Sequence, residues 1–229
     1  MSITTITFDA DFTLWDIKKA VHYALSMTLI ELRTRLPGTQ TEQLTVLELQ
    51  QTRDAVAQEL EGSNLLLEEI RLRAFERTLQ KIGSNDLELA QYLTTFYLEL
   101  RFAADVLYPD VVPILTDLKA HYQLGLVSNG NTYPERCGLP DIFTFSVFAP
   151  RDSLRHKPHP EIYQKVIKLA GREPGEILHI GDMLIDDISG AQSVGMRAIW
   201  LNRESKPNKT TIRPDATITS LTELPQMLT

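Results

Sequence analysis

The sequence predicts an α/β fold in which an open parallel sheet is interrupted, after its first strand, by a domain made only of helices. From about residue 108 onward, short apolar runs alternate with helical patterns, which is typical of βαβ units whose sheet is covered on both faces. One further strand pattern stands alone at residues 3–8, and residues 17–104 show helical periodicity only. A helical insertion between the first strand and the rest of the sheet is the simplest arrangement that joins these observations.

The first half of the chain contains one strand and then several helices. Residues 3–8 are mostly β-branched and aromatic, as expected of a short buried strand. Between residues 17 and 104 apolar side chains recur every three or four positions, as Leu89, Leu93 and Phe96 do. Breaks between helices are expected at residues 37–38, 62–64 and 83–86, and the last of these offers a cap for the next helix.

The second half alternates between the two kinds of element. Helices are expected near residues 110–121, 160–170 and 185–194, with a short helix before residue 145. Strands are expected at residues 123–127, 145–148, 177–180 and 198–201, followed by a polar loop at 203–212. We therefore expect an α/β core made of residues 1–14 and 108–229, and a helical domain at residues 15–107.

Composition and charge restrict the class of partner. The chain has 229 residues, of which 43% are hydrophobic, and this is enough to bury a sizeable core. A formal net charge of −7 argues against non-specific binding to nucleic acid or to an anionic membrane surface. No apolar run approaches the roughly 18 residues that span a bilayer. The single cysteine, Cys137, and an N-terminus without signal-peptide features predict a cytoplasmic location.

Polar clusters follow four of the predicted strands or precede the helices after them. They are Asp9–Thr13, Ser128–Gly130, Lys157 with Pro158, and Asp182 with Asp186 and Asp187. Ligands bind at the carboxyl ends of the strands in open α/β sheets, so we expect these clusters to converge. Taken singly, each cluster has a simpler explanation as a helix cap, a turn, a solvated lysine or acids near a helix N-terminus. Their occurrence together favours a functional site.

The acidic side chains indicate a divalent cation. Two carboxylates 4 Å apart repel by about 4 kcal/mol at an effective dielectric of 20, so Asp9, Asp11 and Asp182 need a counter-charge. Hard oxygen ligands without a neighbouring His or Cys favour Mg²⁺ over Zn²⁺. With Lys157 as a point charge and Ser128 with backbone N–H groups as donors, the set suits phosphoryl transfer.

In order and spacing, these motifs resemble those of the haloacid dehalogenase (HAD) superfamily. Asp9–Thr13 is similar to its first motif, DxDxT, Ser128 to the second and Lys157 to the third. The run from Asp182 to Asp187 is similar to the fourth. The resemblance covers nearly the whole chain and implies a Rossmann-like core with a helical cap domain of the C1 type.

The resemblance also implies a role for each residue. Asp9 would attack phosphorus and form an aspartyl-phosphate, while Asp11 would protonate the leaving group and then activate water. Mg²⁺ would be bound by the carboxylates of Asp9 and Asp182 and by the backbone carbonyl of Asp11. Phosphate would be bound by Thr13, Ser128, Asn129 and Lys157. Asp187 would support the metal site, with Asp186 as the competing candidate.

Other functions are consistent with parts of this pattern. Dehalogenases of the superfamily typically lack an acid at the position of Asp11, so its presence argues for a phosphatase that acts on a small phosphorylated metabolite. A phosphosugar mutase keeps both aspartates and has a histidine about where His22 lies, although a surface histidine is the simpler explanation. A binding module on an inactive core is the alternative from another class. The sequence also departs from the family at Phe12, where many members have Gly or Asn.

Overall fold

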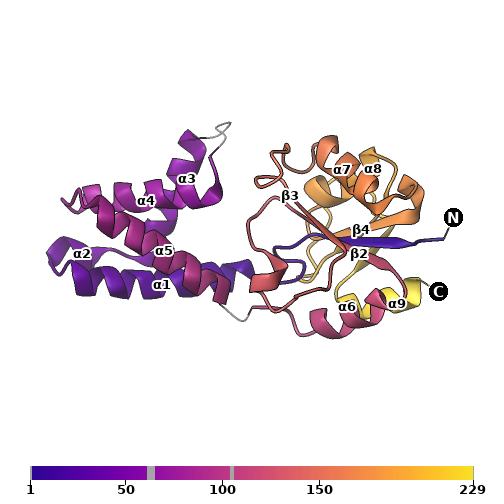
Figure 1. Ribbon diagram of the computed structural model, residues 1–229, viewed down its shortest axis with the longest axis horizontal. Helices are drawn as coiled ribbons and strands as arrows, with labels where there is room; N and C mark the ends of the chain where they lie inside the picture. The colour runs from indigo at the N-terminus through magenta and orange to yellow at the C-terminus, as the bar shows by residue number, and fades with distance from the viewer. Residues whose placement is uncertain (1, 61–64, 104–105, 229) are drawn as a thin grey trace. The chain divides into compact units, whose positions relative to one another are not determined.

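The structure is a computed structural model that describes residues 2–60, 65–103 and 106–228 (Figure 1). These residues divide into two compact units. An α/β unit comprises Met1–Asp16 and Leu107–Thr229, and a helical unit comprises Ile17–Val106. The assignment of these units as catalytic core and cap stays a prediction.

The α/β unit contains one parallel sheet, as predicted. Its strands lie in the order β3-β2-β1-β4-β5-β6, and all neighbouring pairs run parallel. The strands are β1 (Thr5–Phe8), β2 (Gln123–Ser128), β3 (Phe145–Phe148), β4 (Ile177–Gly181), β5 (Arg197–Leu201) and β6 (Ala216–Ile218). The strand order reverses direction at β1, which pairs with β2 on one side and β4 on the other. Open sheets bind their ligands in the crevice at such a switch point.

Helices cover both faces of this sheet (Figure 1). One face carries α6 (Val111–Lys119) and α9 (Leu224–Met227), and the other carries α7 (Pro160–Ala170) and α8 (Gly190–Ser193). A buried cluster between the sheet and the second pair of helices includes Val127, Val147, Ile162, Ile177 and Ile188. Burial of each such side chain stabilises the fold by about 1.5–3 kcal/mol.

Three elements differ from the sequence-based expectation. The helix expected near residues 185–194 is a π-helical turn at Leu184–Ser189 followed by the short α8. The edge strand β6 and the helix α9 were not predicted, because three residues and four residues are too few to show a period. β6 is a strand because it pairs with β5, not because its own sequence pattern favours a strand.

The helical unit consists of helices throughout its described residues. They are α1 (Ile17–Arg35), α2 (Thr39–Gln43), α3 (Val46–Glu59), α4 (Leu67–Lys81) and α5 (Leu87–Ala103). The breaks expected at 37–38 and 83–86 are present, and Asp86 accepts the Leu89 N–H at 2.8 Å as the expected cap of α5. The break expected at 62–64 lies outside the described residues. Among the described helices, none has the length and apolarity needed to cross a bilayer.

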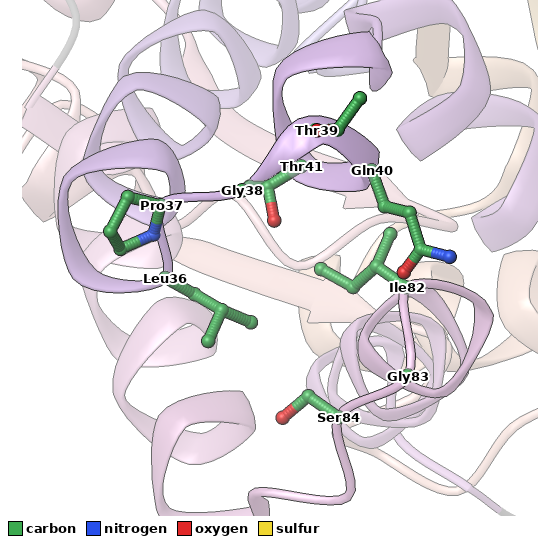
Figure 2. A pocket seen from close by; sticks show the side chains of 9 residues that line it. All are labelled: Leu36, Pro37, Gly38, Thr39, Gln40, Thr41, Ile82, Gly83 and Ser84. Atoms are coloured by element: carbon green, nitrogen blue, oxygen red, sulfur yellow. The ribbon is translucent and has the colours of Figure 1, made fainter.

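The described residues of the helical unit line at least two cavities. One of about 330 Å³ lies between the chain around α2 and the turn after α4, where Figure 2 shows Leu36, Gln40, Ile82 and Ser84 at its wall. The other, of about 560 Å³, is lined by Ile17, Lys18, Val21, His22 and Leu25 of α1 and by Val46, Leu47 and Gln50 of α3. The two cavities lie toward opposite ends of α1, whose 19 residues span about 27 Å. The larger of these two cavities lies at the N-terminal end of α1, which follows the Asp9 loop in the chain.

Candidate active site

The loop after β1 occupies the centre of the sheet edge. Phe8 pairs with Leu126 of β2 and with Ile180 of β4, so the next residue, Asp9, emerges between the ends of both neighbours. The Asp9 N–H donates to the Ile180 carbonyl at 2.8 Å, which extends the strand pairing by one step. The side chain of Asp9 is buried, with 7% of its residue surface exposed. Strand register thus places this carboxylate at the switch point.

Lys157 is brought to Asp9 from the loop between β3 and α7. Its ammonium group donates to Asp9 Oδ1 at 2.5 Å, to Asp187 Oδ1 at 2.7 Å and to the Val127 carbonyl at 3.1 Å. These three acceptors match the three N–H bonds of an ammonium group. The backbone of Lys157 is held as well, because its N–H and C=O groups bind the Asn129 side chain at 2.7 and 3.1 Å. The amide of Asn129 therefore joins the second and third motifs.

Asp187 lies on the π-helical turn and anchors Lys157 from the other side. Its Oδ2 accepts the Met183 N–H at 2.9 Å, and its Oδ1 accepts from Lys157 and lies 3.3 Å from His179 Nε2. Gly181 leaves space for it, since a Cβ at that position would overlap the Asp187 carboxylate. Asp186 is more exposed, and its carbonyl accepts the Tyr163 hydroxyl at 2.6 Å. Of the two acids, Asp187 is the one whose carboxylate points to Lys157.

Three carboxylates gather at this edge and fit a hard cation. Oxygen atoms of Asp9, Asp182 and Asp187 lie within 4.8 Å of one another. The backbone of Asp182 is fixed by Trp200 of β5, whose Nε1–H donates to the Asp182 carbonyl at 2.8 Å. Oxygen-only donor sets of this kind suit Mg²⁺. Asp11 was predicted to bind the metal through its backbone carbonyl, and its carboxylate accepts a separate hydrogen bond described below.

The close approach of these buried charged groups shifts their pKa values. Burial raises the pKa of Asp9 to about 7 and that of Asp182 to about 8, and the neighbouring carboxylates add to both shifts. Burial opposes ionisation of Asp187 as well, but the charge of Lys157 and the hydrogen bond from His179 hold its pKa well below the usual range. Burial would lower the pKa of Lys157, yet Asp187 and Asp9 raise it well above its usual range. Asp187 and Lys157 therefore form an ion pair, while Asp9 and Asp182 lack a full counter-charge.

The loop after β1, residues 9–16, is a tight turn that closes on Trp15. The Trp15 side chain is fully buried, and its Nε1–H donates to Asp11 Oδ1 at 2.7 Å. Phe12 adopts a left-handed conformation with φ of 63°, and its N–H donates to the Trp15 carbonyl at 2.8 Å. The left-handed conformation costs a non-glycine residue such as Phe12 about 1–2 kcal/mol. The turn keeps this conformation although Phe12 stands where Gly or Asn would adopt it more easily. Such strain is found at functional sites where the surroundings enforce the conformation.

Thr13 and Ser128 line the same loop region. Thr13 Oγ1 is buried and has no hydrogen-bond partner among the described residues. Ser128 Oγ accepts the Gly130 N–H at 2.9 Å. A Cβ on Gly130 would lie 2.9 Å from Asp11 Oδ2 and 3.2 Å from Ser128 Oγ, so this glycine permits the second motif to approach the first.

Arg203, which sequence reasoning placed in a plain loop, supports the turn. Its guanidinium donates to the Thr13 carbonyl at 2.9 Å and binds both oxygens of Asp110 at 2.9 and 3.0 Å. It also lies over the ring of Tyr108, 4.0 Å from the centroid. Arg203 thus ties together the two segments that lead into and out of the helical unit.

His179 was missed as well, although the sequence carried a signal for it. It is fully buried in β4, within the apolar run Ile-Leu-His-Ile, and a polar residue buried in a strand needs partners. Nothing in the sequence spacing of Trp15 indicated its hydrogen bond to Asp11. His22, on which the phosphosugar mutase alternative was based, is exposed on α1 and lines the larger cavity.

Comparisons with known proteins agree with this geometry. The profile of the haloacid dehalogenase-like hydrolase family matches residues 3–195. The N-acylneuraminate-9-phosphatase of Mus musculus is 28% identical over 70% of this chain and 68% of its own. A 5-amino-6-(5-phospho-D-ribitylamino)uracil phosphatase of Escherichia coli is 29% identical over 89% of this chain and 85% of its own.

The same architecture occurs in solved structures. The crystal structure of a 2-haloacid dehalogenase from Pseudomonas syringae pv. Tomato DC3000 superposes with a TM-score of 0.82 at 32% identity, over 99% of this chain and 98% of that one. The parallel sheet, the four motifs at its carboxyl edge and the family match over most of the length lead to one conclusion. The chain belongs to the haloacid dehalogenase-like hydrolase family.

Proposed function

We propose that this protein is a Mg²⁺-dependent phosphatase that hydrolyses a small phosphorylated metabolite through an aspartyl-phosphate on Asp9. The observation that carries the proposal is the buried Asp9 carboxylate, one oxygen of which is held by Lys157 at 2.5 Å at the switch point of the sheet. Because Lys157 holds Oδ1, Oδ2 is the oxygen that attacks phosphorus.

Asp9 and Asp182 are the carboxylates that hold the metal, together with the backbone carbonyl of Asp11. Burial, together with the neighbouring carboxylates, raises the pKa of both groups, and a divalent cation supplies positive charge that favours their ionised forms. Asp187 already serves Lys157 and the Met183 N–H, so it supports the site rather than binding the ion directly. When bound, Mg²⁺ supplies charge neutralisation at the phosphoryl oxygens.

The reaction proceeds in two balanced steps. In the first, Asp9 Oδ2 bonds to phosphorus, the bond to the leaving oxygen breaks, and Asp11 in its acid form gives its proton to that oxygen. In the second, the Asp11 carboxylate takes a proton from water, whose oxygen bonds to phosphorus, and the Asp9 carboxylate is released with free phosphate. The Trp15 N–H holds Asp11 Oδ1, which leaves Oδ2 for both transfers.

The phosphate group is bound by the remaining polar groups of the edge. Lys157 provides the positive charge, and the hydroxyl groups of Ser128 and Thr13 provide donors. The buried Thr13 hydroxyl supports this role, since it has no partner among the described residues. Asn129 contributes through its backbone, because its side-chain amide is engaged by Lys157.

Dehalogenation is the second candidate, since the 2-haloacid dehalogenase of Pseudomonas syringae is 32% identical to this chain. A departing halide needs no proton, whereas a departing alkoxide does. Asp11, and a carboxylate cluster that fits a metal, are therefore groups that a dehalogenase would not require. The curated relatives reported above are phosphatases by name, which also supports the first candidate.

The test compares the reactions directly. Purified protein is given p-nitrophenyl phosphate with MgCl₂ or with EDTA, and 2-chloropropionate in a parallel halide assay. We expect Mg²⁺-dependent phosphate release, little halide release, and neither in an Asp9→Asn control. Halide release without metal would replace the proposal with the second candidate. A panel of phosphorylated metabolites then separates hydrolysis, which frees phosphate, from a mutase reaction, which yields an isomeric sugar phosphate.

A further inference from the structure

The buried histidine of β4 has no task in the reaction above. His179 lies between Thr7 of β1 and Asp187 of the π-helical turn, and no part of its side chain reaches solvent. Its Nδ1 lies 2.9 Å from Thr7 Oγ1, and its Nε2 lies 3.3 Å from Asp187 Oδ1. The ring of Tyr163 packs edge-on against it, with centroids 5.4 Å apart. Each ring nitrogen therefore has a polar partner, and bulk solvent does not reach the ring.

The donors and acceptors determine which nitrogen carries the proton. Asp187 can only accept when ionised, so Nε2 must donate to it. Thr7 has one hydroxyl proton and two acceptors in reach, His179 Nδ1 at 2.9 Å and the Leu178 carbonyl at 3.5 Å. The shorter contact places this proton on the bond to Nδ1. The opposite tautomer would set an unprotonated Nε2 against a carboxylate oxygen and leave the Thr7 hydroxyl proton only the long bond to the Leu178 carbonyl.

A fixed Nε2–H donor has consequences for the ion pair next to it. Asp187 Oδ1 is shared between His179 and Lys157, while Oδ2 is held by the Met183 N–H. Together these three donors set the plane of the carboxylate. Lys157 in turn has its three N–H bonds committed, one of them to Asp9 Oδ1. A rotation of Asp187 would therefore shift Lys157 relative to the nucleophile.

We propose that His179 is a positioning residue of the active site. Thr7 selects its Nε2–H tautomer, and this donor orients the Asp187 carboxylate that anchors Lys157 beside Asp9. The effect on turnover rests on the proposed function, whereas the tautomer and the hydrogen bonds do not.

The first experiment reads the tautomer and needs no substrate. Two-bond ¹H–¹⁵N correlation spectra of the ¹⁵N-labelled full-length protein resolve the ring nitrogens, and the His179 signals are those missing from His179→Gln. We expect a protonated Nε2 and an unprotonated Nδ1. Thr7→Val, which keeps the shape and removes the hydroxyl, should shift the Nδ1 resonance. A protonated Nδ1, with or without a protonated Nε2, or an unmoved Nδ1 resonance in Thr7→Val, overturns the proposal.

The second experiment uses the different reach of two amides. The amide of Gln extends to the position of Nε2 and can donate to Asp187, whereas the amide of Asn ends near Nδ1 and cannot. With p-nitrophenyl phosphate and MgCl₂, kcat should fall several-fold in His179→Gln and by about 10–100-fold in His179→Asn and His179→Leu. KM should change by less than about threefold, because phosphate binding through Lys157 persists. Equal losses in Gln and Asn variants with matching thermal stability would show a packing role instead.

The two experiments separate the failure of this inference from that of the proposed function. If the wild-type protein releases no phosphate, the phosphatase proposal fails, and the spectra still decide whether Thr7 and His179 form the stated pair. If phosphate is released but the spectra or the amide variants behave otherwise, only the role of His179 is lost.

Discussion

Lys157 of the α/β unit and the arginine–glutamate pairs of the helical unit hold their charges in opposite surroundings. In the helical unit, Arg35 pairs with Glu31 within α1, and Arg73 pairs with Glu76 within α4. Arg77 of α4 reaches Glu59 at the end of α3. These pairs are largely exposed. In the α/β unit, Lys157 joins two carboxylates that lie 148 and 30 positions away in sequence, and all three groups are buried.

The difference indicates where chemistry takes place. Exposed pairs contribute little to stability, because water competes for both partners. A buried charge without its partner is costly, so its presence requires neighbours held in one geometry. The helical unit's arginines at 33, 53, 73 and 77 contact acids or carbonyls of their own unit, and Arg71 bonds the Tyr97 hydroxyl. This contrast supports the active site proposed above for the α/β unit.

The largest expected effect tests the buried carboxylate at the centre of this contrast. Asp9→Asn replaces a nucleophile by an amide of nearly the same shape, so phosphate release should fall by roughly 10⁴-fold or more. Circular dichroism should show an unchanged fold. Steady turnover from the folded variant would mean that another group attacks phosphorus.

Asp11→Asn removes the proton donor and leaves the nucleophile in place. Turnover should fall by about 10²–10⁴-fold with an alkyl phosphate, and less with p-nitrophenyl phosphate, whose leaving group needs little protonation. Acid quench should trap more aspartyl-phosphate than in the wild type, because water is no longer activated. An equal loss with both substrates and no added intermediate would leave Asp11 a structural role.

Lys157→Met tests how much the buried ion pairs of Lys157 contribute to stability, in comparison with a surface ion pair. It leaves the carboxylates of Asp9 and Asp187 without their cation, and the free energy of unfolding of the α/β unit should drop by about 3–5 kcal/mol. Both tryptophans, Trp15 and Trp200, lie in this unit, so urea unfolding followed by fluorescence reports on it.

The matched control is Arg77→Met in the helical unit, which breaks the pair with Glu59 on the surface. Its unfolding curve should be close to that of the wild type. Similar losses in both variants would remove the proposed distinction between the two units.

The metal-free site should make stability depend on pH in a defined direction. The raised pKa values of Asp9 and Asp182, about 7 and about 8 against 3.8, mean that the folded protein keeps protons that the unfolded chain has released. These two groups therefore lower stability as pH rises from about 4 to about 8. The depressed pKa of Asp187 has the opposite effect and acts only below this window.

Mg²⁺ binds the ionised carboxylates, so it should raise the melting temperature more at about pH 8 than at about pH 5. Differential scanning fluorimetry with MgCl₂ and with EDTA measures both trends. The Asp182→Asn variant, which removes one ligand, should lose most of the metal-dependent shift. A shift that does not vary with pH would contradict the assigned carboxylates.

The smallest effect concerns Arg203, which is partly exposed and yet joins distant segments. Arg203→Met removes the donor to the Thr13 carbonyl and the bidentate pair with Asp110. A slight displacement of the loop after β1 should lower kcat by about tenfold. Arg213→Met, a change in the same exposed region, should have no such effect, and equal activities of the two variants would limit Arg203 to a surface role.

Much of this protein could be predicted from local patterns. The alternation of apolar runs and helical stretches predicted the parallel sheet, and the positions of Asp9, Ser128, Lys157 and Asp182 at strand ends predicted their convergence. Such features depend on spacing within short windows of chain, where periodicity and turn chemistry act. The roles of individual residues, including those of Thr13 and Asn129, stay predictions.

Only the tertiary structure decided the partners of these residues. The bond from Trp15 to Asp11, the placement of His179 between Thr7 and Asp187, and the clamp of Arg203 on Thr13 and Asp110 join segments through contacts that no periodicity encodes. The contact between Asp187 and Lys157 is of the same kind, since a π-helical turn rather than an α-helix sets the direction of the Asp187 side chain. The physical reason is that a buried hydrogen bond depends on the three-dimensional position and direction of both groups, whereas a sequence pattern specifies only which residue types are available along the chain.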